Sequence, residues 1–136
     1  MDKKHYMVGT KVIDTVDTAR EEKLGPKTGN RIVVARLYYP ATVKDEQRVE
    51  IPKKTVGEMY ANAKMLPEKF PLIVYNHGYG GYVESNNNLC CQLAAQGFFV
   101  VSVGHAYEAG KLTLSDGTHI LADKSIKKRM IQPRFE

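Results

Sequence analysis

Residues 76–81 (Asn-His-Gly-Tyr-Gly-Gly) have the composition of a loop that could do chemistry. Gly78, Gly80 and Gly81 indicate close backbone approach or positive φ. The segment stands between an apolar run and a helical pattern, so its N–H groups could bind an anion or the developing oxyanion of acyl transfer. A nucleotide-binding loop is disfavoured, because no Gly-Lys-Ser/Thr follows and the Gly-x-Gly-x-x-Gly spacing is incomplete.

Further polar and aromatic residues are expected at the same edge of the fold. His105 follows a predicted strand, at the carboxyl edge where α/β sheets place their ligands. A hydrogen-bonded loop histidine is nevertheless the favoured interpretation over a catalytic one. Tyr79, Tyr82 and Tyr107 would gather nearby. They either line an acyl or aromatic pocket or simply cover the end of the sheet.

Other candidate nucleophiles and ligands are weak. No serine stands in Gly-x-Ser-x-Gly; Ser102 comes nearest, but it lacks the leading glycine and falls within a predicted strand. Cys90 and Cys91 could form a vicinal disulfide or a reactive thiol, but their helical context favours buried, inert thiols. The histidines have no ligand spacing, so no metal site is expected.

Two strands are predicted near the amino terminus, the first with one solvent-facing side. Residues 8–17 alternate β-branched and polar side chains, and residues 31–39 form a second strand that we expect to end at Pro40 and to pair antiparallel with the first. Residues 41–70 are a polar insertion. Within it, Thr55 and Glu58 have capping-box spacing and predict a short helix running on through Met59.

A βαβ unit follows. Residues 71–76 read as a strand covered on both faces, residues 85–96 as a helix with Leu89 on its apolar face, and residues 98–103 as a parallel strand. Residues 111–121 predict a hairpin around Asp116-Gly117. The fold class is therefore α/β with a mixed sheet.

The charge pattern excludes few partners. Twenty basic and fifteen acidic residues alternate along most of the chain. A basic cluster at the carboxyl end reads as a solvated tail, so nucleic acid is not the expected partner. Eighteen apolar residues never run together and no secretory leader is evident, which together with the cysteine usage predicts a cytoplasmic protein without a membrane span.

The chain resembles the platelet-activating factor acetylhydrolase and dienelactone-hydrolase branch of the α/β-hydrolases. The resemblance rests on PLIVYNHGYGG, on the following AAQGF and VVSVGHAYEAG, and on an opening VGTKVIDTVDTAREE before a strand that ends LYYPA. It implies a serine hydrolase fold, without a cofactor, in which Tyr79 supplies an oxyanion-hole N–H from its backbone. It also implies that His77 shapes the loop and is not the catalytic base.

The same resemblance implies that the catalytic serine, acid and histidine lie beyond residue 136. Residues 1–136 would then be a single incomplete domain of a serine esterase or lipase-like hydrolase acting on carboxylic or phospholipid acyl esters, inactive alone. The alternative is a non-catalytic truncated product or an oligomerising module. In either case the strand at residues 72–75 would lie at an open sheet edge, so a homo-oligomer is expected.

Overall fold

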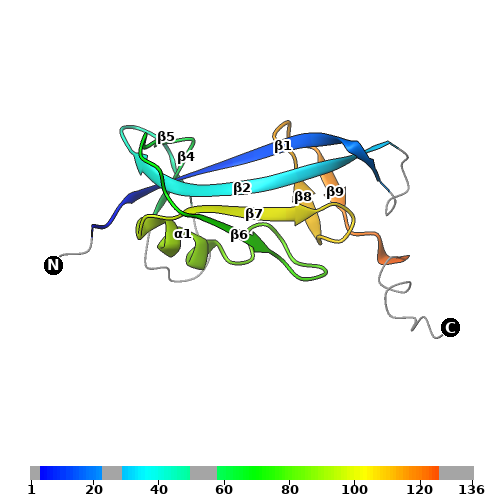
Figure 1. Ribbon diagram of the computed structural model, residues 1–136. Coiled ribbons are helices and arrows are strands. Elements are labelled where there is room, and N and C mark those ends of the chain that lie inside the picture. The colour runs from blue at the N-terminus through cyan, green and yellow to red at the C-terminus, as the bar shows by residue number, and fades with distance from the viewer. Residues whose placement is uncertain (1–3, 23–28, 50–57, 126–136) are drawn as a thin grey trace.

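A curled, mixed sheet dominates the computed structural model, which describes residues 4–22, 29–49 and 58–125 (Figure 1). The seven-stranded sheet has the order β3-β4-β1-β2-β7-β6, with β5 also paired to β2, and β8 and β9 form a separate hairpin. The elements are β1 (Met7–Glu21), β2 (Asn30–Thr42), β3 (Arg48–Val49), β4 (Met59–Ala61), β5 (Lys64–Met65), β6 (Leu72–Asn76), α1 (Asn87–Ala95), β7 (Phe99–His105), β8 (Lys111–Thr113) and β9 (His119–Leu121).

The predicted antiparallel pair is present as β1 and β2, but both strands are longer than expected. Pro40 does not end β2, and the prediction that it would was wrong. Its carbonyl accepts from Leu66 N–H at 3.1 Å, and a residue's C=O and N–H point to the same side of a strand. The nitrogen of Pro40, which carries no hydrogen, therefore faces the region of β5. Pro40 lies beyond Tyr38, which is the last β2 residue paired with β7.

The helix predicted around Met59 is not formed where the structure can test it. Thr55 lies outside the described residues, and Met59–Ala61 form β4, which runs parallel to β1 with Met59 opposite Val8. Met59 is fully buried. Pairing with β1 and burial of this side chain outweigh a local capping signal, as tertiary context commonly does.

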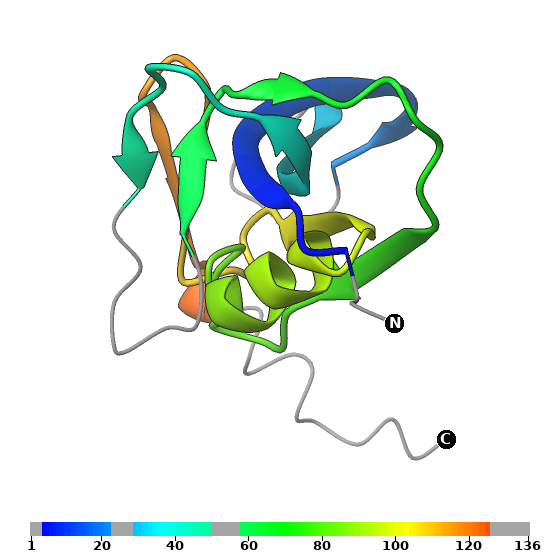
Figure 2. The same cartoon turned by 90° about the vertical axis from the view of Figure 1, so that its left-hand side faces the viewer.

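The βαβ unit is formed by β6, α1 and β7, with β6 and β7 parallel. The prediction that its first strand is covered on both faces was wrong, because β6 is an edge strand with every second residue exposed. Leu89 was also misplaced: it is 50% exposed, since the helix buries the face containing Cys90 and Ala94 instead. Figure 2 shows α1 beneath the bend of β1.

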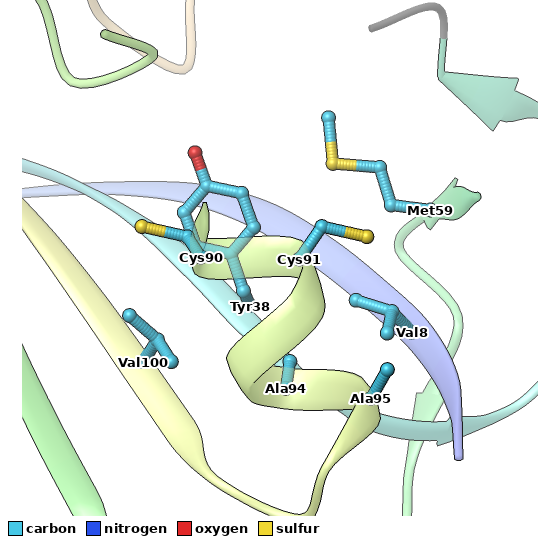
Figure 3. Close-up of a cluster of buried hydrophobic side chains, with 8 residues drawn as sticks. All are labelled: Val8, Tyr38, Met59, Cys90, Cys91, Ala94, Ala95 and Val100. Carbon is cyan, nitrogen blue, oxygen red and sulfur yellow. The ribbon is translucent and has the colours of Figure 1, made fainter. Parts of the chain in front are cut away.

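The main core cluster lies between α1 and one face of the sheet (Figure 3). Cys90 and Cys91 are both free and buried in it, which confirms that they are packing residues. Burial raises the pKa of each thiol to about 11. The members of the cluster are Val8, Tyr38, Met59, Cys90, Cys91, Ala94, Ala95 and Val100.

The hairpin covers the same sheet face farther along. Leu112 of β8 is fully buried against Val34 of β2, and Ser115 N–H donates to the Asp14 carboxylate of β1. The turn lies at Asp116-Gly117, as the sequence indicates, with φ of +88° at the glycine. None of the helices in the described segments has the length and apolar character needed to cross a membrane.

Candidate functional site

The glycine-rich loop begins where β6 ends, beside the end of β7. In the parallel register Asn76 lies opposite Val103, so both strands deliver their carboxyl ends to one edge of the sheet. The His105 ring lies across this edge, with Nε2 3.1 Å from Asn76 Oδ1. The structure thus brings His105 next to the loop, at the position where α/β sheets bind ligands.

The imidazole of His77 links the loop to β7. Its Nε2 accepts the backbone N–H of His105 at 3.1 Å, so the proton of the neutral ring is on Nδ1, which lies 2.8 Å from the carbonyl oxygen of Gly78. The side chain is 8% exposed, and its ring packs edge-on against the His105 ring at 5.0 Å. Both ring nitrogens are occupied, which leaves His77 holding the loop.

The loop N–H groups have unequal roles. Gly81 N–H donates to Gly78 O at 2.9 Å, and Gly80 N–H donates to Glu108 O at 2.8 Å. Gly80 has φ of +74°, a conformation that favours glycine. Within the described part of the chain, the N–H of Tyr79 has no hydrogen-bond acceptor. A turn built this way leaves the Tyr79 amide available to a ligand.

The turn after β7 supports the loop from the other side. Gly110 N–H donates to Gly81 O at 2.9 Å, and a Cβ at Gly110 would lie 2.9 Å from both Gly80 O and the Tyr82 ring. Only glycine allows this approach. The turn is also bonded to the segment that follows β9, because Asp123 N–H donates to Tyr107 O at 2.9 Å.

The segment after the loop is anchored to the sheet by side chains. Ser102, fully buried in β7, donates its hydroxyl to Val83 O at 2.7 Å. Arg36 of β2 forms an ion pair with Glu84 at 3.5 Å. Ser102 is therefore a structural residue, and its environment gives it no access to a substrate.

Tyr79, Tyr82 and Tyr107 lie in different environments. Tyr79 and Tyr82 are 41% and 47% exposed, and the Tyr79 hydroxyl lies 3.5 Å from the carbonyl of Asp123. Tyr107 is half-buried, has φ of +66° and packs on the hairpin cluster. Tyr107 thus covers the sheet end, whereas the other two side chains remain available at the loop.

A cavity of about 520 Å³ adjoins the turn, between the far ends of β1 and β2 and the end of β7. Of the residues singled out from the sequence, only His105 lines this cavity. Its charged lining was not predicted, because it depends on how the distal ends of two long strands meet β7. The lining residues are Asp17, Arg20, Glu22, Arg31, Ile32, Val33, Val103, Gly104, His105, Ala106 and Glu108. Across the described segments, no three His, Cys, Asp or Glu side chains group as metal ligands.

Comparison with known proteins agrees with the loop motif. Residues 51–132 match the family model described as platelet-activating factor acetylhydrolase, isoform II. The chain belongs to this family. A platelet-activating factor acetylhydrolase from Gallus gallus is 39% identical over 54 residues, which are 39% of this chain and 13% of that protein.

The fold is also that of a larger esterase. A ferulic acid esterase from Streptomyces cinnamoneus superposes with a TM-score of 0.77 at 26% identity, over 91% of this chain and 40% of that one. The chain therefore spans a minor part of the length of both relatives. These matches confirm the resemblance to esterases of the α/β-hydrolase kind and place this member of the acetylhydrolase family among proteins with a mixed, curled sheet.

Proposed function

We propose that the loop from His77 to Gly81 serves carboxylic-ester hydrolysis by donating the backbone N–H of Tyr79 to the oxyanion of the tetrahedral intermediate. One observation supports this proposal: Gly80 and Gly81 donate their N–H groups within the protein, whereas those of Gly78 and Tyr79 have no acceptor in the described residues, and the family resemblance matches the donor to Tyr79. The names of the two relatives, an acetylhydrolase and a ferulic acid esterase, favour acyl esters as the substrate class.

The chemistry requires a donor that is fixed before the reaction. When a nucleophile attacks an ester carbonyl, negative charge develops on oxygen, and a preorganised N–H there lowers the barrier without any rearrangement. His77, Gly80 and Gly110 supply the rigidity through the hydrogen bonds and close approach described above. Tyr79 would act by its backbone, which leaves its half-exposed side chain to contact the acyl or alcohol group.

The nucleophile is not expected among these 136 residues. They contain no Gly-x-Ser-x-Gly, and Ser102 is buried with its hydroxyl donated to Val83. Cys90 and Cys91 are buried thiols with pKa values of about 11, so the thiolate is scarce near neutral pH. We therefore propose that residues 1–136 are a single incomplete hydrolase domain, with the 41–70 segment as an insertion, and that they do not turn over an ester alone.

A second candidate is a non-catalytic role in assembly. Within residues 4–22, 29–49 and 58–125, β6 pairs with β7 alone, and its other edge, with Leu72 63% exposed, supports this role. The two candidates differ in what they require of the loop: the assembly role leaves Tyr79 N–H without a purpose, whereas the hydrolase role needs it.

The first test is hydrolysis of a short-chain p-nitrophenyl ester by the purified 136-residue chain, with a fluorophosphonate probe and intact mass on the same sample. We expect neither turnover nor adduct. Turnover with a stoichiometric adduct would reveal a nucleophile that the structure does not indicate and overturn the proposal.

The second test addresses the loop itself. Amide hydrogen exchange resolved by residue should show Tyr79 exchanging much faster than Gly80 and Gly81, whose N–H groups are bonded. The Tyr79→Ala variant should keep this order because the role belongs to the backbone. Protection of Tyr79 equal to that of Gly81 would contradict a free donor.

A further inference from the structure

Val83, which follows the loop closely in the sequence, is held by β7 in two ways. Its carbonyl oxygen accepts the hydroxyl of the fully buried Ser102 at 2.7 Å. Its side chain is also buried and occupies the space beside Gly104, where an added Cβ would lie 2.8 Å from Val83 Cγ1. A glycine inside a strand often marks such a close approach. Ser102 and Gly104 lie on the same face of β7 and together form a socket for Val83.

A tight turn presents Val83 to this socket. Tyr82 N–H donates to Ser85 Oγ at 2.8 Å, and Ser85 N–H donates to Tyr82 O at 3.1 Å. These bonds leave Val83 and Glu84 at the corner of the turn, where Glu84 forms its ion pair with Arg36 of β2 at 3.5 Å. The corner is therefore bonded to two strands at once, to β7 through Val83 and to β2 through Glu84.

The same turn is in direct contact with the glycine-rich loop. Tyr82 connects Val83 to Gly81, and the Tyr82 ring lies 2.9 Å from the position that a Cβ on Gly110 would take. The carbonyl oxygen of Gly81 accepts Gly110 N–H at 2.9 Å. A displacement of Val83 would therefore pass through Tyr82 and disturb the bond that holds Gly81.

We propose that Ser102 is a positioning residue for ester hydrolysis, an inference that rests on the function proposed above. Through Val83 it fixes the carboxyl end of the loop, while His77, which accepts from His105 of the same strand, fixes the other end. The Tyr79 N–H between these two points is thereby held in place before an oxyanion forms, which is the condition for stabilising that charge without rearrangement.

The residue type at position 102 supports this role. Ser102 interrupts the apolar sequence of β7 at a position without exposure, where an apolar side chain would avoid the cost of burying a hydroxyl. Such a side chain would leave the carbonyl of Val83 without its donor. The hydroxyl of Ser102 therefore serves the backbone of the turn, at a depth where it never meets a substrate.

Two matched variants of the 136-residue chain separate positioning from stability. Ser102→Ala and Tyr39→Phe each remove a buried hydroxyl that donates to a backbone carbonyl, that of Val83 in the first case and that of Ala63, at 2.8 Å, in the second. Tyr39 belongs to a core cluster on the opposite face of the sheet, away from the loop. Urea unfolding should therefore show similar losses of stability in the two variants.

Residue-resolved amide exchange then tests the loop. We expect Ser102→Ala alone to speed the exchange of Gly80 and Gly81 N–H, by at least roughly fivefold when the variants are compared at equal free energy of unfolding. Ser102→Thr keeps the hydroxyl and should restore the rates of the parent chain. Equal rates in Ser102→Ala and Tyr39→Phe would show that Ser102 contributes to stability only and overturn the proposal. The exchange of Tyr79 N–H, which tests the proposed function, is read separately in the same spectra, so either idea can fail alone.

Discussion

The backbone N–H of His105 donates to Nε2 of His77 across 3.1 Å, from the end of one parallel strand to the first residue after the other. This bond requires the Nδ1–H tautomer of His77. We predict that two-bond ¹H–¹⁵N correlations of the His77 ring show a protonated Nδ1 and an unprotonated Nε2 at neutral pH. The opposite tautomer would mean that His77 does not accept from His105.

Removal of the His77 ring should loosen the loop. His77→Ala leaves the partly buried N–H of His105 without its acceptor, so we expect a loss of about 1–3 kcal/mol in the free energy of unfolding. Urea denaturation followed by circular dichroism measures it. His119→Ala is the control, since His119 is exposed on β9 and should cost less than about 0.5 kcal/mol. Equal losses in the two variants would contradict the role assigned to His77.

Two glycines near the loop should differ in their tolerance of a methyl group. Gly110→Ala forces a Cβ to within 2.9 Å of Gly80 O and the Tyr82 ring, and we expect it to destabilise the chain by about 1–3 kcal/mol and to expose the Gly80 amide to exchange. Gly78→Ala meets no atom within 4 Å and should change stability by less than about 1 kcal/mol. Thermal unfolding of both variants decides between these outcomes; a Gly110→Ala chain as stable as Gly78→Ala would show that the approach is not tight.

Stability should fall in alkaline solution because of the buried thiols. Burial raises the pKa of Cys90 and Cys91 from 9.0 to about 11, so the unfolded chain releases these protons first. The contribution is fully present below pH 9 and is lost as pH rises toward 11. Burial also raises the pKa of Tyr38, which acts in the same direction.

The thiol contribution is isolated by a variant. Urea unfolding of the parent chain and of Cys90→Ala/Cys91→Ala, measured from pH 8 to 11, should give a difference in stability that narrows steadily above pH 9. A difference that stays constant across this range would mean that the thiols titrate alike in both states.

The Tyr38 hydroxyl should be coupled to Asn87 at the start of α1. Tyr38 is fully buried and donates to Asn87 Oδ1, so Tyr38→Phe leaves that oxygen unpaired at a cost of about 1–3 kcal/mol. In Tyr38→Phe/Asn87→Leu both partners become apolar, and the combined loss should be smaller than the sum of the single losses. Strict additivity in this double-mutant cycle would contradict the coupling.

Local patterns were sufficient for much of this fold. The alternation before Asp17, the apolar runs on either side of α1 and the Asp116-Gly117 turn each reflect chemistry within a few residues, and they predicted β1, β6, β7 and the hairpin. The failures involve distant partners. Met59 forms a strand because β1 lies beside it, and Pro40 remains in β2 because the pairing of β2 with β7 ends at Tyr38, two residues before it.

The site was predictable only in its outline. Glycine spacing indicated a tight loop at His77 to Gly81, and the strand before it fixed its place at the sheet edge. Two contacts could not be predicted from the sequence: the hydrogen bond from Gly80 N–H to Glu108 O, and the close approach of Gly110 to the loop. Both join two turns that follow different strands. That Tyr79 N–H has no acceptor among the described residues, whereas Gly80 and Gly81 N–H do, is visible only in the structure.

The central position of β2 has a consequence for how the chain folds. β2 meets β1 through a nearby connection, but its other long edge pairs with β7, which comes far later in the sequence. Loop closure over such a separation is entropically costly, so the β1–β2 pair is the natural nucleus and docking of β7 is the slow step. Until that step is complete, the edge of β2 that pairs with β7 stays open, and an unpaired strand edge of this kind is prone to aggregation.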